Sequence, residues 1–223
     1  MNKILASAAV ALSLCGCGGG GGSSGPDVVA STLDFPVDAA ASSYFQSAHH
    51  FNLSGVLYGR TPFSAVMTLT PGSGTTTFQG QSVLYATQTL TVYDQYGAYA
   101  GSTSSTSYFN TGPFRVYGGT DSNGNVTVSD STPRLPTTAK VGQSGPLGTS
   151  TTYSDSTLNN VVSTETDSWS LEADTASTAW LCLNAQYADG TWSKDCYEID
   201  ASGNVMGYKG SGTDGNGVST LHS

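Results

Sequence analysis

Apolar and polar residues alternate along most of the chain after residue 50, with the period of two that is typical of β-strands. The longest such run covers residues 81–93, where Leu84, Ala86, Leu90 and Val92 share one face. Further runs that predict strands occupy residues 52–58, 64–70, 108–117, 125–130, 149–154, 161–173, 179–187, 191–200 and 204–209. Gly, Asn and Asp separate these runs. The pattern predicts an all-β fold, an antiparallel sandwich or open barrel of about ten strands.

One segment instead repeats apolar residues at helical spacing. Pro36 precedes it, Asp38 suits its first turn, and its apolar positions are Val37, Ala41, Tyr44, Phe45 and Ala48. We therefore expect one short N-terminal helix over residues 37–49. His49 and His50 would lie at its C-terminal end, where an imidazole interacts favourably with the helix dipole. Adjacent residues of a helix point in different directions, so this pair does not predict a metal site.

A three-residue turn with Gly at its third position, residues 188–190, fixes the pairing of two late strands. If Tyr187 and Thr191 close this turn, Cys182 lies directly opposite Cys196. This register predicts a disulfide. The bridge would close a loop of 15 residues, worth roughly 3 kcal/mol in the chain-entropy model.

A second turn of the same kind, residues 201–203, would place Tyr208 opposite Cys196. One face of the resulting sheet forms the expected core, with Leu181, Leu183, Ala185, Tyr187, Tyr197, Ile199 and Val205. The opposite face carries the disulfide and a candidate binding face made of Trp180, Trp192, Met206 and Tyr208. The alternative is that neighbouring elements cover these side chains.

The charge balance excludes one class of partner. The chain has 16 Asp and Glu against 7 Lys and Arg, a net charge of −9, and no basic stripe offsets it. Such a surface repels phosphate backbones, so we expect no nucleic-acid partner. Charged residues make up only 10% of the chain and Gly is frequent, with 28 residues, which is typical of secreted β-proteins.

The N-terminal residues predict export. Lys3 precedes an apolar run over residues 4–14, then come Leu14, Cys15, Gly16 and Cys17, followed by only Gly and Ser over residues 18–25. The apolar run is too short to remain as a membrane-spanning helix. Over residues 1–25 the chain resembles uncharacterised bacterial lipoproteins with a lipobox-like signal and a glycine-rich tether.

This resemblance implies a signal peptide over residues 1–16, a lipidated Cys17 and a tether over residues 17–35. It also implies a lipid anchor in the outer membrane, because Gly rather than Asp follows the cysteine. The alternative is an ordinary cleaved signal. A β-rich domain over residues 36–223 would follow, with a possible subdivision near residues 131–145, where Pro133 and Pro136 lie.

No set of residues in the sequence predicts catalysis. Residues 142–146 depart from the Gly-x-Ser-x-Gly nucleophile elbow, and no helix is expected after them. A glycosidase needs two carboxylates across a cleft, and strand spacing gives no reason to pair any two of the candidates Glu165, Asp167, Glu172, Asp195 and Glu198. No cofactor and no metal site are predicted.

We therefore expect a cell-envelope lipoprotein with a non-catalytic structural or binding role at the membrane surface, whose partner is a protein or an apolar small molecule. A second hypothesis is a periplasmic carrier of an apolar ligand, held in a cavity between the helix and the sheet. A third is a hydrolase acting on envelope polymers, which would require two carboxylates converging in one cleft.

Overall fold

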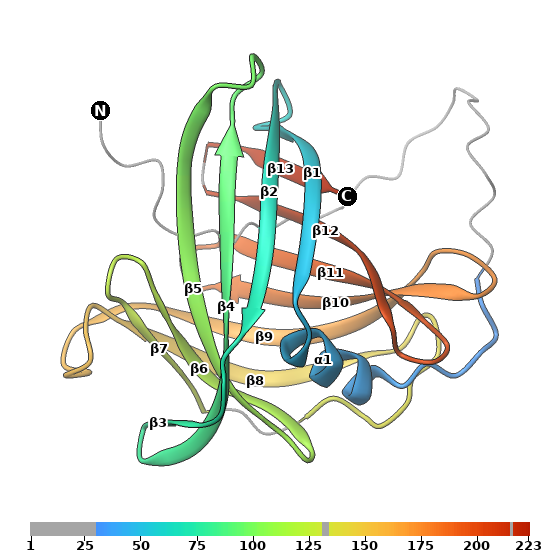
Figure 1. The fold of residues 1–223 in the computed structure, drawn as a ribbon, viewed down its shortest axis with the longest axis horizontal. Coiled ribbons are helices and arrows are strands. Elements are labelled where there is room, and N and C mark those ends of the chain that lie inside the picture. The colour runs from blue at the N-terminus through green and yellow to red at the C-terminus, as the bar shows by residue number, and fades with distance from the viewer. Residues whose placement is uncertain (1–29, 131–133, 215) are drawn as a thin grey trace.

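The computed structural model describes residues 30–130, 134–214 and 216–223, which form one helix and thirteen strands (Figure 1). The elements are α1 (Val37–Gln46), β1 (His49–Leu57), β2 (Thr61–Pro71), β3 (Thr76–Phe78), β4 (Gln81–Tyr93), β5 (Tyr99–Thr111), β6 (Phe114–Asp121), β7 (Val126–Ser129), β8 (Ser144–Tyr153), β9 (Val161–Ala173), β10 (Thr178–Tyr187), β11 (Trp192–Asp200), β12 (Val205–Thr213) and β13 (Val218–His222). The predicted all-β class with one short N-terminal helix is confirmed. The expected lipidation site at Cys17, the signal peptide and the tether up to residue 29 lie outside the described residues.

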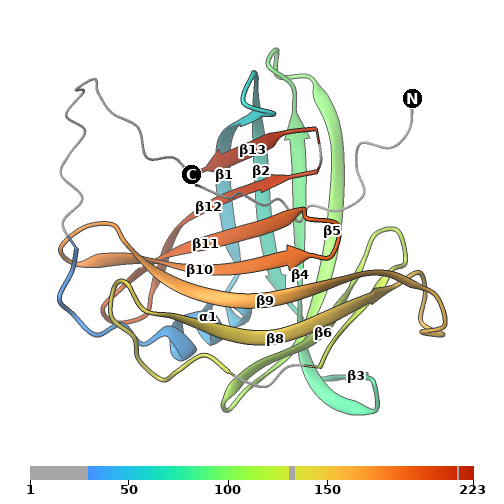
Figure 2. The same ribbon diagram turned by 180° about the vertical axis from the view of Figure 1, so that it is seen from behind.

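The sheet closes on itself and forms an antiparallel barrel. Its strand order is β2-β1-β13-β12-β11-β10-β9-β8-β7-β6-β5-β4-β3, and an additional pairing of β2 with β4 closes the ring and leaves β3 outside it. Strands β8 to β13 lie side by side on the wall seen in Figure 2. Strands β7 and β8 pair directly across the connection over residues 130–143, so strands before and after it belong to one sheet.

Strands β3 and β13 and the first half of β5 were not predicted from the sequence. Over residues 102–107, β5 consists only of Ser and Thr, so no apolar residue marks its inner face. Ser105 and Ser107 of this run face the interior at a place where the barrel is not filled, which explains why the hydrophobic pattern fails there.

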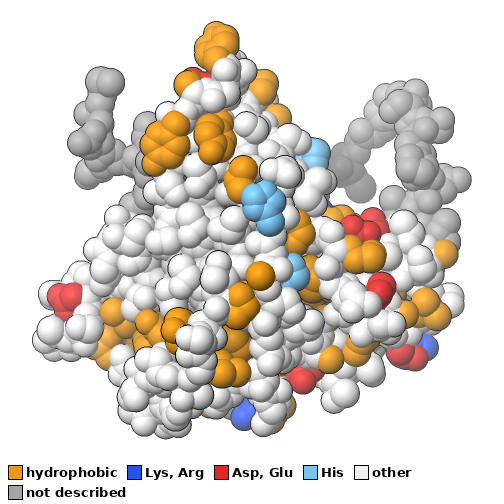
Figure 3. All heavy atoms as spheres, viewed as in Figure 1, with side chains coloured by type: hydrophobic (Ala, Val, Ile, Leu, Met, Phe, Trp, Pro, Cys, Tyr) orange, Lys and Arg blue, Asp and Glu red, His pale blue; other side chains and the backbone are white. Residues whose placement is uncertain are grey.

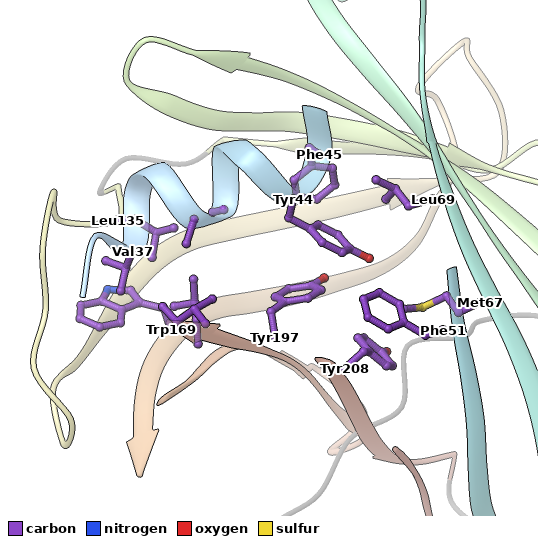
Figure 4. Packing of buried hydrophobic residues seen from close by; sticks show 14 of the residues in the cluster. Val37, Tyr44, Phe45, Phe51, Met67, Leu69, Leu135, Trp169, Tyr197 and Tyr208 are labelled. Carbon is purple, nitrogen blue, oxygen red and sulfur yellow. The ribbon is translucent and has the colours of Figure 1, made fainter. Parts of the chain in front are cut away.

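Helix α1 lies inside one end of the barrel. It contacts β2, β4, β6 and β12, strands that lie on different sides of the ring, and most of its residues are buried. Figure 4 shows Val37, Tyr44 and Phe45 of the helix directed into a cluster with Met67 and other buried side chains. This end of the barrel is therefore a filled hydrophobic core.

The helix ends at Gln46, three residues before the predicted end, and His49 begins β1 instead. The His49 ring stacks on Tyr44, with centroids 4.9 Å apart, and on Phe51, with centroids 5.6 Å apart. Burial of its ring lowers the pKa of His49, so the neutral imidazole is favoured. The expectation of two histidines at a helix C-terminus is wrong, because His49 packs as an aromatic ring on the inner face of a strand.

The predicted register of β10 and β11 is confirmed, since Cys182 lies opposite Cys196 and the two form a disulfide. The register of β12 is different from the prediction. A β-bulge shifts the pairing after Ile199 and Val205, because Met206 is an extra residue in β12. Tyr208 therefore lies opposite Tyr197 and inside the barrel, and its predicted place on the outer face is wrong.

Candidate functional site

The inner face of the barrel forms an open cavity of about 370 Å³, and Phe45, near the C-terminal end of α1, lines it as well. Strand pairing explains why this space is open. Ser107 pairs with Gly119, and Gly119 pairs with Thr127, so these three positions share one face of the sheet. Their side chains are too short to reach across the barrel. Other short side chains that line the cavity from β5, β7 and β8 include Ser105, Ser129 and Ser150.

Apart from Asp121, whose carboxylate accepts the backbone N–H groups of Asn123 and Asn125 in the turn after β6, three carboxylates line the same cavity: Glu165 and Asp167 from β9 and Asp195 from β11. Glu165 and Asp167 are two residues apart, so both point to the inner face. Strand pairing places Glu165 between Ser150 of β8 and Tyr187 of β10. Asp195 lies two strands away, about 10 Å across the sheet by the usual strand spacing. It is opposite Leu183, which pairs with Trp169, so it is also offset along the strands, by two residues from Asp167 and by four from Glu165. On the face of the molecule seen in Figure 3, by contrast, acidic side chains are scattered.

The surroundings of Glu165 favour its protonated form. Burial raises its pKa from 4.5 to about 7, and the nearby charge of Asp167 adds to the increase. A hydrogen bond with Tyr187 acts in the opposite direction. Near neutral pH, Glu165 can therefore hold or release a proton.

The other two cavity carboxylates each accept a hydrogen bond from a neutral hydroxyl. Ser150 Oγ donates to Asp167 Oδ2 at 2.6 Å, and the Tyr208 hydroxyl donates to Asp195. Burial raises the pKa of both carboxyls, that of Asp195 to about 6, and these hydrogen bonds partly oppose the increase. The charge of Asp130 raises the pKa of Asp167 further. The free energy cost of placing these charges in the barrel is therefore only partly offset by the protein.

A group of tyrosines connects the carboxylates to the core around the helix. The Tyr44 ring lies 4.1 Å from that of Tyr197, and its hydroxyl donates to Gln88 Oε1 at 3.0 Å. Tyr197 in turn lies 5.8 Å from the ring of Tyr208, the donor to Asp195 (Figure 4). Burial raises the pKa of these tyrosines, so they remain neutral hydrogen-bond donors.

Apolar side chains form another part of the cavity wall. Phe45 and Phe114 stack with ring centroids 5.6 Å apart. Leu135, Leu147 and Leu183 also line the cavity. The cavity is therefore amphipathic, with aromatic and aliphatic groups as well as carboxylates and hydroxyls.

The aromatic residues predicted to form a binding face have different surroundings. Trp180 donates its indole N–H to Asp174 at 2.9 Å, and the Lys209 ammonium lies 4.1 Å from the centroid of its ring. Trp192 is buried, whereas Met206 is exposed. Trp180 and Trp192 are thus occupied by packing and polar contacts, which was the alternative weighed from the sequence.

Glu172 lies close to the sulfur atoms of Cys182 and Cys196, in the one cluster of possible metal ligands among the described residues. The two sulfur atoms are bonded to each other, so neither is a thiolate that could bind a metal. Glu172 instead forms an ion pair with Lys194. We assign no metal site to this cluster.

Three of the five carboxylates considered from the sequence thus line one cavity, and two do not. Glu165 and Asp167 are two residues apart in a predicted strand, and this spacing indicates that they share one face of the sheet. The sequence also indicates that Asp195 lies on a strand, but nothing in it shows that the neighbouring side chains leave an open space. The short side chains of β5, β7 and β8 create that space, and their contribution becomes visible only when the sheet is closed.

Comparisons with known proteins give no relative for this chain: no family model, no curated protein and no solved structure matches it. In the part of the chain that the structure describes, no helix is long and apolar enough to cross a membrane.

Proposed function

We propose that this protein is a cell-envelope lipoprotein that binds a small molecule inside its barrel. The observation that carries the proposal is the cavity of about 370 Å³. Its size falls within the range of roughly 300–1,000 Å³ that is common for ligand pockets, and its lining combines apolar surface with a few convergent polar groups. The anchor at Cys17 that the sequence suggests would keep this site at the outer membrane.

The cavity favours a ligand that is partly polar. A carrier of a purely apolar molecule would need an apolar space between helix and sheet, but α1 packs there against a filled core. A purely apolar ligand would also leave the carboxylates Glu165, Asp167 and Asp195 without compensating contacts. We therefore propose an amphipathic ligand.

The proposal is tested by the small molecules that purify with the protein. The chain from Gly18 onward, exported behind a cleavable secretion signal, contains every element of the barrel. Ser107→Phe fills the cavity, and Ser104→Phe adds the same side chain to the outer face of the same strand as a control. Mass spectrometry of solvent extracts should find a compound enriched with the parent chain and with Ser104→Phe but depleted with Ser107→Phe. Equal extracts from all three proteins would contradict the proposal.

The hydrolase hypothesis is supported by one observation, since Glu165 and Asp167 line the same cavity and Glu165 can hold a proton near neutral pH. However, both carboxylates come from one strand. A glycosidase pair lies on either side of the scissile bond, so that one group acts as acid and the other as base or nucleophile. We therefore rank binding ahead of hydrolysis. Turnover of a cell-wall glycan that Glu165→Gln abolishes would reverse this order.

A further inference from the structure

We infer that the cavity binds an organic cation, a small molecule in which a protonated amine or a quaternary ammonium group is joined to an apolar body. This inference rests on the proposed function and specifies the class of ligand. It follows from three features of the cavity: its uncompensated negative charge, its aromatic wall and the wide separation of its carboxylates.

The carboxylates that face the cavity have no cationic partner in the described part of the chain. The two ion pairs found there, Lys140 with Asp34 and Lys194 with Glu172, involve none of them. The donors that reach the cavity carboxylates are neutral hydroxyl groups. A bound cation would supply the missing charge in a setting of low dielectric constant, where such an attraction is stronger than in water.

The two arginines of the lining form no ion pair with these carboxylates. The buried Arg115 Nε has no hydrogen-bond partner among the described residues. The Arg115 guanidinium lies 4.6 Å from the centroid of the Tyr117 ring, which packs in a separate apolar cluster with Phe78 of β3. Arg134 is exposed, and its charge acts on Asp38. Neither side chain therefore neutralises the carboxylates of β9 and β11.

The aromatic wall fits the same ligand. The face of a benzene ring attracts a cation, and Phe45 and Phe114 both line the cavity. Leu135, Leu147 and Leu183 offer apolar surface to the rest of the molecule. An anionic ligand of the same shape would instead be repelled by three carboxylates.

The separation of the carboxylates favours an organic cation over a metal ion. A divalent ion needs several oxygen ligands within about 2.0–2.6 Å of one point. Among the described residues, the cavity carboxylates do not form a group of three potential ligands within 4.8 Å of one another. An ammonium group needs only one or two such oxygens.

The inference is tested with three probes of nearly equal shape: 2-phenylethylamine, 2-phenylethanol and 3-phenylpropanoate. Binding to the secreted chain from Gly18 onward is followed by calorimetry and by the methyl NMR signals of Leu135, Leu147 and Leu183, at about pH 8, where Glu165 is mostly ionised. We expect the amine to bind at least about tenfold more tightly than the alcohol and the carboxylate to bind least.

Two variants assign the preference to the cavity. Glu165→Gln should remove most of the advantage of the amine over the alcohol, and it should leave the affinity for the alcohol nearly unchanged. Glu172→Gln makes the same change on the outer face of the same strand and should keep the full advantage.

The outcomes separate this inference from the proposed function. If the alcohol or the phenylpropanoate binds as tightly as the amine and shifts the same leucine signals, the cavity is a binding site but the cation inference is wrong. If the amine preference survives in Glu165→Gln and also when Asp195→Asn is added, the inference is likewise overturned. If none of the three probes shifts these signals at millimolar concentration, both the inference and the binding function are contradicted.

Discussion

Replacing Glu165 by Gln is expected to stabilise the protein, and the gain should grow with pH. Burial in the barrel raises the pKa of this carboxyl from 4.5 to about 7. Between these two pH values the folded protein keeps a proton that the unfolded chain has lost. The folded state is therefore favoured most below about pH 4.5, and this advantage is lost as the pH rises through about 7.

The magnitude follows from the size of the pKa change. A rise from 4.5 to about 7 corresponds to a free energy of about 3 kcal/mol, because one pKa unit is worth about 1.4 kcal/mol. Glu165 lines an open cavity, where water reduces the penalty, so we expect a gain of about 1–3 kcal/mol at high pH. A neutral amide of the same shape avoids this penalty at every pH.

Urea unfolding at about pH 4 and at about pH 8 measures the effect directly. Glu165→Gln should match the parent protein at the lower pH and exceed it in free energy of unfolding at the higher pH. Glu172→Gln, on the outer face of the same strand, should show no such gain, since Glu172 already pairs with Lys194. A difference between parent and Glu165→Gln that is the same at both pH values would refute the assignment of a raised pKa to Glu165.

Three further predictions concern the disulfide, the polar network and the anchor. Replacing Cys182 and Cys196 together by Ser should lower the free energy of unfolding by about 3 kcal/mol, measured by urea unfolding, and two titratable thiols in the unreduced parent protein would disprove the bridge. Tyr208→Phe should raise the pKa of Asp195 above about 6, because the variant lacks the hydroxyl that stabilises the carboxylate; an unchanged carboxyl titration by NMR would contradict this role. Cys17→Ala should move the protein out of membrane fractions, and continued membrane association would refute lipid anchoring at this residue.

The sequence predicts the strands well wherever one side of the sheet is apolar and buried. Strands β4 and β9 have the bounds expected from residues 81–93 and 161–173. The turn over residues 188–190 fixed the pairing that brings Cys182 and Cys196 together. In these segments the alternation of side chains and the residues of the turns are local features, so the sequence alone is enough to predict the strands and their pairing.

The site could not be predicted in the same way because it depends on closure of the sheet. Ser107 and Thr127 look like residues of polar strands, yet both face the interior. The bulge at Met206 also has no local signal in the sequence, and it alone moves Tyr208 from the outer face to the side of Asp195. One extra residue in a strand reverses the direction of every side chain beyond it, which is why a register extended from a turn failed there.

A crystal structure of the protein purified directly from the cells that produce it would test the central claim most directly. The account predicts electron density for a small molecule in the cavity, with a polar group near Glu165 and Asp167 and an apolar part against Phe45 and Phe114. A cavity that contains only ordered water, in a protein whose mass also shows no bound compound, would contradict it.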